Sequence, residues 1–358
     1  MTKTVIPFGP QHPVLPEPLQ LKLVMEDDRI VEALPSIGYV HRGLEKLVEL
    51  KDFNQTVYIV ERVCGICSFM HSMAYVRGIE EIMDVKIPER AEYLRVIWAE
   101  LARVQSHLLW LGLLADAFGF ESLFMEVWKY REKIMDLMEM TTGNRVIISA
   151  NKVGGTTKDL SDEHLKIIIS TIDDLEKKIK RVESVFLDNY TVKQRLVGVG
   201  LLSYDDVREY CTVGPVARAS GIKMDLRCTG YSAYKYLDFE PAFDTAGDSY
   251  ARVAVRIKEI YTSFDLIRQA ISKLPKGEIN VPVRGMPNGE AISRIEQPRG
   301  EAVYYLKANG TKFLSRLKIR TPTFANIPVL LKMLPGCKLA DVPVLILTID
   351  PCISCTER

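Results

Sequence analysis

Two cysteine pairs with the same spacing lie near opposite ends of this chain. The first is Cys64 and Cys67, within ERVCGICSFMH, and the second is Cys352 and Cys355, within DPCISCTER. Two thiolates three positions apart can bind one metal ion, and two such pairs can form a four-sulfur site. Because 284 residues separate Cys67 from Cys352, only the folded chain can bring the pairs together. The spacing therefore predicts a buried metal centre that closes the fold.

The composition excludes several classes of function. The chain has 358 residues, with 47 Lys and Arg against 46 Asp and Glu. This balance gives no electrostatic basis for binding nucleic acid or an anionic membrane surface. We find no signal peptide and no apolar run of about 18 residues, so we expect no transmembrane helix. Seven cysteines without a secretory signal indicate a reduced, intracellular protein, and the isolated Cys211, Cys228 and Cys337 are expected in the core.

Alternating apolar residues predict two β-hairpins. The first joins residues 19–25 to residues 30–34 through an acidic turn. The second joins residues 302–308 to residues 311–319 through Asn309-Gly310, a dipeptide that strongly favours a tight hairpin turn.

Helical periodicity dominates the rest of the chain. Long helices are expected to begin at Pro88, at Ser161 and at Asp248, and the last should stop at Pro275. Another helix should follow Cys67. We expect an α+β fold, mainly α, with a long-helix core, small antiparallel hairpins and a single domain over residues 1–358.

Polar residues of defined type flank both cysteine pairs. Arg62 and His71 border the first pair, and Asp350 with Pro351 directly precedes the second. A structural zinc site with four cysteine ligands is one interpretation. Zinc ribbons, however, close within a few tens of residues because the metal replaces a missing core. This chain is 47% hydrophobic, and a redox metal would use a buried arginine and other charged neighbours to tune its potential.

The motifs resemble those of a known family. RVCGICSFMH and DPCISC resemble the two signature motifs of the large subunit of nickel–iron (NiFe) hydrogenases. The motifs between them resemble segments that this family shares with the quinone-site large subunit of respiratory complex I: GPQHP, GYVHRGLEKL, TGNR, GPVARASGIKMDLR, GDSYARVAVR, QPRGE and RTPTFAN. The resemblance covers nearly the whole chain and implies the hydrogenase large-subunit fold. This combination of cysteine motifs and complex I-like motifs is most similar to that of the group 4, energy-converting (Ech-type) hydrogenases.

The resemblance implies a role for each cysteine. Cys64 and Cys352 would be terminal ligands of nickel, and Cys67 and Cys355 would bridge nickel and iron. The iron would also carry carbonyl and cyanide ligands. The complex I relative lacks the CxxC pairs, so the four cysteines favour a hydrogenase.

The resemblance also implies roles for residues around the metals. Arg299 would overhang them, although Pro298-Arg299-Gly300 alone also fits an exposed turn. Thr323 matches the segment that hydrogen-bonds a cyanide. Glu17, held between two prolines, is a candidate proton gate, and a solvated loop glutamate is the alternative.

Glu45 matches a glutamate that binds magnesium in many relatives. Those relatives often add a histidine three residues past the last cysteine, where this chain has Arg358. Arginine is a poor metal ligand, so the expected magnesium site departs from the pattern.

The function implied is reversible reduction of protons to H2. Electrons would come from ferredoxin through an iron–sulfur small subunit, because this chain has no iron–sulfur cluster motif of its own. Integral membrane subunits would translocate ions and hold the chain at the cytoplasmic face of the membrane. The alternatives are a metal-free quinone-module subunit of a complex I-like dehydrogenase and a scaffold stabilised by a four-cysteine zinc site.

Overall fold

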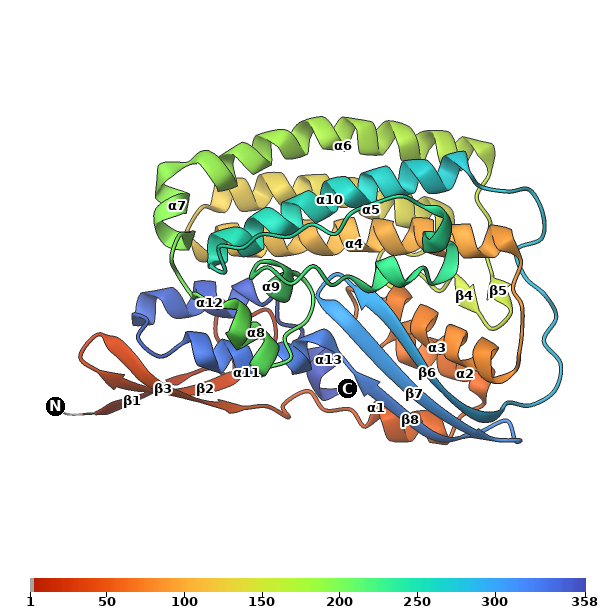
Figure 1. Cartoon of the computed structure of the whole chain (residues 1–358), viewed down its shortest axis with the longest axis horizontal. Coiled ribbons are helices and arrows are strands. Elements are labelled where there is room, and N and C mark those ends of the chain that lie inside the picture. Colours follow the sequence, from red (N-terminus) through yellow and green to blue (C-terminus); the bar gives the residue numbers. More distant parts are fainter. Residues whose placement is uncertain (1–2) are drawn as a thin grey trace.

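Four long helices form the largest layer of the protein (Figure 1), seen here in a computed structural model that describes residues 3–358. They are α4 (Glu89–Ala117), α5 (Glu121–Thr142), α6 (Asp162–Asp188) and α10 (Ser249–Ser272). α4 packs against α5 and α10, and α6 covers both of these neighbours. α4 is buried around most of its circumference, whereas α6 buries a single apolar stripe from Ile168 to Phe186. The two burial patterns place α4 inside the layer and α6 at its outer surface.

The helices expected from the sequence are all present. α3 (Ser68–Ile82) follows Cys67, and α4, α6 and α10 begin after the expected cap residues. The side chain of Ser161 accepts a hydrogen bond from the His164 N–H at 3.2 Å, as an N-cap residue does. We did not predict α5, although its buried Leu123, Val127 and Ile134 recur at helical spacing. The α+β, mainly α fold class is confirmed.

Shorter helices surround this layer: α1 (Leu44–Glu49), α2 (Phe53–Glu61), α7 (Tyr190–Leu196), α8 (Tyr204–Glu209), α9 (Pro215–Arg218), α11 (Pro322–Met333), α12 (Val342–Thr348) and α13 (Ile353–Glu357). Across residues 3–358, no helix has the length and apolar character needed to cross a membrane. The expectation that the isolated cysteines lie in the core is wrong. Cys211 and Cys228 are exposed and Cys337 is half-buried, because they lie in short connections between the packed elements, Cys228 in the 3-10 helix Leu226–Thr229.

Two antiparallel sheets of three strands complete the fold. One consists of β1 (Thr4–Phe8), β2 (Gln20–Glu26) and β3 (Arg29–Ser36), and the other of β6 (Asn288–Gln297), β7 (Gly300–Asn309) and β8 (Leu314–Arg320). A third sheet has two strands of two residues each, β4 (Asn151–Lys152) and β5 (Gly155–Thr156), and lies beside α3 and α4. Both predicted hairpins are confirmed as β2–β3 and β7–β8, and Gly310 supplies the left-handed φ of 78° in the second turn. β1 and β6 were not predicted.

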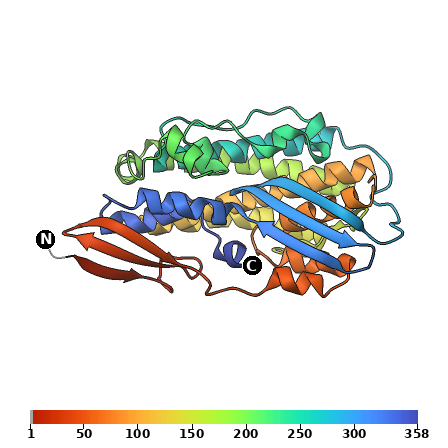
Figure 2. The same cartoon turned by 60° about the horizontal axis from the view of Figure 1, so that its bottom comes forward.

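The end of the chain lies between these two sheets (Figure 2). α11 contacts β3 on one side and β7 on the other, and α13 packs against α11. α12 lies against α4 and α10 of the helical layer. This placement carries the second cysteine pair into the middle of the molecule.

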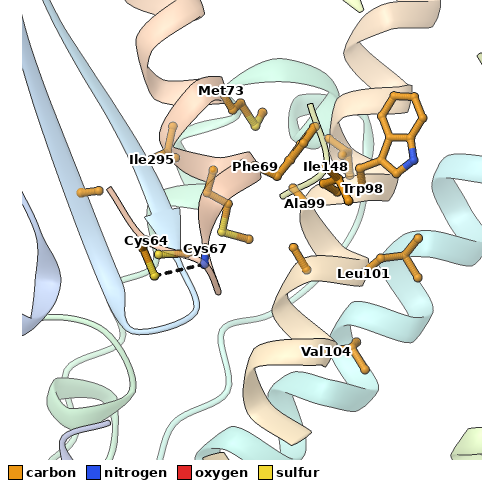
Figure 3. Close-up of a cluster of buried hydrophobic side chains, with 14 of the residues drawn as sticks. Cys64, Cys67, Phe69, Met73, Trp98, Ala99, Leu101, Val104, Ile148 and Ile295 are labelled. Carbon is orange, nitrogen blue, oxygen red and sulfur yellow. Dashed lines mark hydrogen bonds between the residues drawn. The ribbon is translucent and has the colours of Figure 1, made fainter. Parts of the chain in front are cut away.

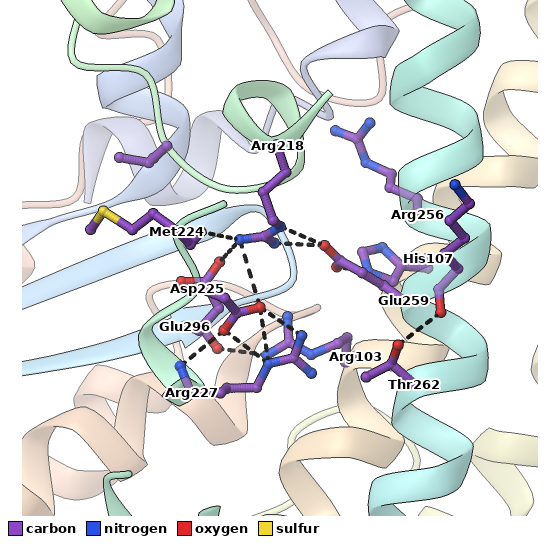
Figure 4. A network of polar contacts seen from close by, with 12 residues as sticks. Arg103, His107, Arg218, Met224, Asp225, Arg227, Arg256, Glu259, Thr262 and Glu296 are labelled. Atoms are coloured by element: carbon purple, nitrogen blue, oxygen red, sulfur yellow. Dashed lines mark hydrogen bonds and ion pairs between the residues drawn. The ribbon is translucent and has the colours of Figure 1, made fainter. Parts of the chain in front are cut away.

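A network of buried charges joins the helical layer to the β6–β8 sheet (Figure 4). Arg218 of α9 contacts Glu259 of α10 at 2.6 Å and Glu296 of β6 at 2.9 Å. Arg227 contacts Asp225 at 2.7 Å and Glu100 of α4 at 3.1 Å. All of these side chains are at most 3% exposed. A charge this deeply buried is tolerated only when it is paired and hydrogen-bonded, so the network fixes how these elements dock.

The network predicts that removing a buried arginine destabilises the protein far more than removing a surface arginine. Arg218→Ala should lower the free energy of unfolding by about 3–5 kcal/mol, because it leaves two buried carboxylates without their guanidinium. Arg268→Ala is the matched control, since Arg268 also contacts two carboxylates but its side chain is 32% exposed; its loss should cost less than about 1 kcal/mol. Denaturant unfolding of the two variants measures both values. Equal losses would contradict the structural role assigned to the network.

Candidate metal centre

The first cysteine pair lies in the turn between α2 and α3 and belongs to the hydrophobic core (Figure 3). Cys64 and Cys67 are 2% and 1% exposed. The N–H groups of Ile66 and Cys67 point at the Cys64 sulfur, at 3.2 and 3.5 Å. Cys67 is also the N-cap of α3, where the helix dipole favours negative charge. The turn is therefore built to hold thiolate sulfur.

The second pair lies at α13, where Cys352 is the N-cap and Cys355 is within the helix. Asp350 has a φ of 53°, which turns the chain sharply before Pro351. The Cys352 N–H donates to the Thr323 hydroxyl at 3.1 Å, and the Thr321 hydroxyl donates to the Cys355 carbonyl at 3.1 Å. Both threonines lie at the start of α11, so this helix positions the backbone of both cysteines.

The structure brings the four sulfurs together. The Sγ atoms of Cys64 and Cys352 are 3.4 Å apart, and those of Cys67 and Cys355 are 3.7 Å apart. The ligand atoms of Cys64, Cys67 and Cys355 all lie within 4.8 Å of one another. Sulfurs bound at ~2.3 Å around one tetrahedral ion would be ~3.8 Å apart, close to the two separations of 3.4 and 3.7 Å.

The charges in the cluster also suit a cation. Hydrogen bonds from the neighbouring sulfurs, Cys352 first, lower the pKa of Cys64 well below that of an ordinary thiol. Burial and the neighbouring sulfurs raise the pKa of Cys355. The cluster alone therefore holds one thiolate readily and resists further ionisation, whereas a bound cation would stabilise several thiolates.

His71 lies beside the cluster, as expected. Its Nε2 is 3.3 Å from the Cys355 sulfur, and its Nδ1 is 2.6 Å from the Tyr304 hydroxyl. Burial lowers the pKa of His71 to about 4, so the imidazole is neutral near pH 7. A neutral ring that accepts the Tyr304 O–H at Nδ1 donates its Nε2–H to the sulfur. Tyr304 on β7 was not predicted from the sequence.

Arg299 is in the β6–β7 turn, yet it is only 5% exposed. Its Nη2 is 2.8 Å from an Asp350 carboxylate oxygen, and its Nε donates to the Asp350 carbonyl at 2.8 Å. Burial opposes the charge, but Asp350 and the cysteine sulfurs raise the pKa of Arg299, so it stays a guanidinium. Arg299 is thus both a turn residue and a buried one, and the exposed-turn alternative is wrong.

The turn is held by close backbone packing. Pro298 is buried beside Arg299, and Gly214 lies against the same turn. Gly214 has a φ of 70°, and a Cβ there would lie 2.3 Å from the Arg299 carbonyl oxygen. This contact requires glycine at the start of the GPVARAS motif, and it holds the backbone of Arg299 in place.

A cavity of about 440 Å³ opens directly beside the cysteines. Cys64, Cys352, Arg299, Asp350 and Glu17 line it, and the remaining wall is mostly apolar: Ile66, Leu109, Trp110, Leu113, Trp128 and Leu347. Arg299 Nη1 and Asp350 Oδ2 are buried and have no hydrogen-bond partner within residues 3–358. Structural zinc sites are closed, whereas catalytic metal sites keep an open position. The tryptophans and leucines of α4 and α5 were not predicted, because one helix pattern does not tell a cavity wall from a core.

Glu17 lies at this cavity and is half-buried. One carboxylate oxygen accepts hydrogen bonds from the N–H groups of Ile353 and Ser354, the second of these at 3.0 Å. The other oxygen accepts from the Ser354 hydroxyl. Glu17 therefore caps the first turn of α13, and the solvated-loop alternative is wrong.

Two expected residues lie away from the cysteines. The side chain of Arg62 is 55% exposed and donates to the Tyr58 carbonyl at 2.7 Å, so the expectation of a buried arginine beside the metal is wrong for this residue. It caps the end of α2, where the chain turns the side chain outward. Glu45 on α1 lines a different cavity and contacts Lys318 and Arg358.

Comparison with protein families matches the chain in two parts. Residues 42–116 match the family described as nickel-dependent hydrogenase. Residues 117–285 and 283–358 match the family described as the 49-kDa subunit of respiratory-chain NADH dehydrogenase. The boundary falls at the end of α4, so the two cysteine pairs lie in segments matched by different families.

Individual relatives align over almost their whole length. The carbon monoxide-induced hydrogenase of Rhodospirillum rubrum is 40% identical over 100% of both chains. The membrane-bound hydrogenase subunit alpha of Pyrococcus furiosus is 38% identical, over 99% of this chain and 87% of the relative. A solved chain from the membrane-bound sulfane sulfur reductase, an archaeal respiratory membrane complex, has a TM-score of 0.95 and 31% identity, covering 99% of this chain and 98% of that one.

The sulfur geometry predicts that the metal-free chain binds one Ni²⁺. Anaerobic titration should give one equivalent of sulfur-to-nickel charge-transfer absorption. Cys352→Ser should weaken this binding by about 100-fold or more, because a hydroxyl is a much harder ligand than a thiolate. Cys228→Ser, at an exposed thiol, is the matched control and should bind as the unaltered chain does. Equal affinities for the two variants would exclude Cys352 as a ligand.

Proposed function

This chain belongs to the family that unites the large subunits of nickel-dependent hydrogenases with the 49-kDa subunit of respiratory NADH dehydrogenase, and from that premise we propose that it is the catalytic large subunit of a membrane-associated, energy-converting NiFe hydrogenase. The proposed reaction is reversible reduction of protons to H2. The observation that carries the proposal is the convergence of four thiol sulfurs at a mostly apolar cavity beneath a buried arginine.

The position of each sulfur relative to the cavity supports its proposed role. Cys64 and Cys352 line the cavity, which suits terminal ligands of a nickel ion with an open position. Cys67 and Cys355 lie behind them, which suits sulfurs that bridge nickel to an iron carrying carbonyl and cyanide ligands. When bound, this centre would supply heterolytic H2 chemistry, which also needs a base close to the open position.

Arg299 serves this site as a fixed positive charge. Its pKa is far too high for proton transfer, and its contacts with Asp350 hold the guanidinium in one orientation. The unpartnered Nη1 is available to donate a hydrogen bond into the cavity. Thr323 holds the Cys352 N–H on the opposite side. Arg299 through Asp350 and Thr323 directly thus hold the backbone that leads into Cys352.

Glu17 is the proposed proton relay. It borders the cavity beside Cys352 and is itself half-buried, so it links the dry interior to the surface. Its bonds to α13 hold the carboxylate in place. A carboxylate at such a boundary can take up and release a proton without large movement.

The proposed partners follow from what the chain lacks and from its relatives. Its sequence contains no iron–sulfur motif, so electrons would arrive through an iron–sulfur small subunit from a ferredoxin-like donor. Integral membrane subunits would hold it peripherally at the cytoplasmic face and translocate ions. Relatives named as membrane-bound hydrogenase and membrane-bound sulfane sulfur reductase support its association with a membrane complex.

A second candidate is reduction of a sulfur substrate at the same cysteines. The TM-score of 0.95 and 31% identity with a chain of the sulfane sulfur reductase support it as a candidate beside the metal-free quinone subunit. The assay must therefore compare protons with polysulfide as electron acceptors.

The proposal predicts nickel and iron in equal amounts in this chain, in addition to the iron that the iron–sulfur clusters of its partners bring to the purified complex. Infrared spectra should contain carbonyl and cyanide bands, and reduced ferredoxin should drive H2 evolution. Arg299→Lys should keep the metals and bands but lower turnover by about 100-fold, because an ammonium lacks the planar donor fork. Zinc without iron would support the scaffold, absence of metal would support the quinone module, and polysulfide reduction without H2 would support the second candidate.

Glu17→Gln should test proton relay separately from helix capping. Glutamine retains one acceptor oxygen but cannot titrate, so H2 evolution should fall by about 100-fold while the infrared bands stay unchanged. Hydrogen exchange of the Ile353 and Ser354 amides reports on the cap. Normal evolution in this variant would limit Glu17 to capping α13, and lost infrared bands would mean that it supports assembly of the centre.

A further inference from the structure

The Glu45 carboxylate accepts hydrogen bonds from three donors. One oxygen accepts from the Ile319 N–H and from Arg358 Nε, each at 3.0 Å, and the other contacts Lys318 Nζ at 2.8 Å. Burial opposes ionisation, but Lys318, the Ile319 N–H and Arg358 together lower the pKa of Glu45. The carboxylate is therefore ionised at neutral pH, and it joins three elements: α1, β8 and the end of α13.

Arg358 is fixed by more than this one contact. Its Nη1 donates to the Thr356 carbonyl at 3.1 Å, and its guanidinium lies 5.6 Å from the centre of the Phe324 ring. The side chains of Arg358 and Glu45 are 18% and 15% exposed, so water screens the pair only partly. Arg358 is three residues beyond Cys355, on the short helix that carries this cysteine.

The surrounding cavity does not suit a divalent cation. Lys46, Arg316, Lys318 and Arg358 line it, against the carboxylates of Glu45 and Glu357. The two Glu357 oxygens are also taken, by the N–H groups of Gly38 and Val40 at 2.5 Å each. Magnesium needs near-octahedral oxygen coordination at 2.0–2.1 Å. It would have to displace both cations from Glu45 and would then lie among like charges.

We infer that the Arg358 guanidinium takes the place of the expected magnesium ion on Glu45 and that this ion pair fastens α13, with Cys355, to α1 and β8. A guanidinium supplies one positive charge and directional donors, so it can bridge the same elements without metal. Arg358 is a positioning residue in this inference. The inference holds whether or not the four sulfurs bind nickel.

The first test uses Mn²⁺ as a paramagnetic probe with ligand preferences close to those of Mg²⁺. Electron paramagnetic resonance should detect the same number of bound Mn²⁺ ions per purified complex in the unaltered protein and in Glu45→Gln, because Glu45 holds no divalent cation. One equivalent of Mn²⁺ present in the unaltered complex and lost in Glu45→Gln would overturn the inference.

The second test compares two cations on the same carboxylate. Arg358→Gln should increase amide hydrogen exchange over residues 353–357 by about tenfold, because a charge-assisted hydrogen bond is lost. Lys318→Gln is the matched control, since it also removes a cation from Glu45 but leaves Arg358 in place. Arg358→Lys should restore part of the protection. The inference is overturned if Arg358→Gln and Lys318→Gln exchange alike over these residues.

Discussion

The four sulfurs can meet only because the segment from α12 to α13 is held inside the molecule by side chains from distant elements. Its carbonyl groups are bound by buried donors: Trp110 Nε1 to Leu347 at 2.5 Å, Arg256 to Thr348 at 3.1 Å and Arg299 to Asp350 at 2.8 Å. A carbonyl at the end of a helix has no partner within the helix. Side chains from other parts of the molecule supply these partners and thereby fix the position of Cys352.

The same donors set the electrostatics of the site. Burial lowers the pKa of Arg256 to about 10, yet this group is still charged at neutral pH. Its guanidinium lies 4.1 Å from the centre of the Trp110 ring, where the face of the indole is negative. Arg299 thus places positive charge close to sulfurs that would be anionic as ligands, and Arg256 adds positive charge at the segment that leads to Cys352. Charge balance around the centre is therefore a property of α10 and the β6–β7 turn, elements remote from both cysteine pairs.

α13 is anchored at both ends by glutamates from the first fifty residues. Glu17 binds its first N–H groups, and Glu45 binds Arg358 at its other end. A helix of five residues has little stability of its own. The position of Cys355 therefore depends on these two carboxylates.

The sequence by itself determined the elements that depend on local pattern. Ser161 and Asp248 start helices because their side chains cap the first turn, and Asn309-Gly310 closes a hairpin because glycine accepts the left-handed backbone. The spacing of the cysteines alone also predicted that the two CxxC pairs meet at one site. Only the tertiary structure decided that Arg62 points to solvent, that Arg299 is buried in its turn, and that Arg358 contacts Glu45. The physical reason is that the partner of a charged side chain is set by packing between elements far apart in the chain, and no local pattern encodes it.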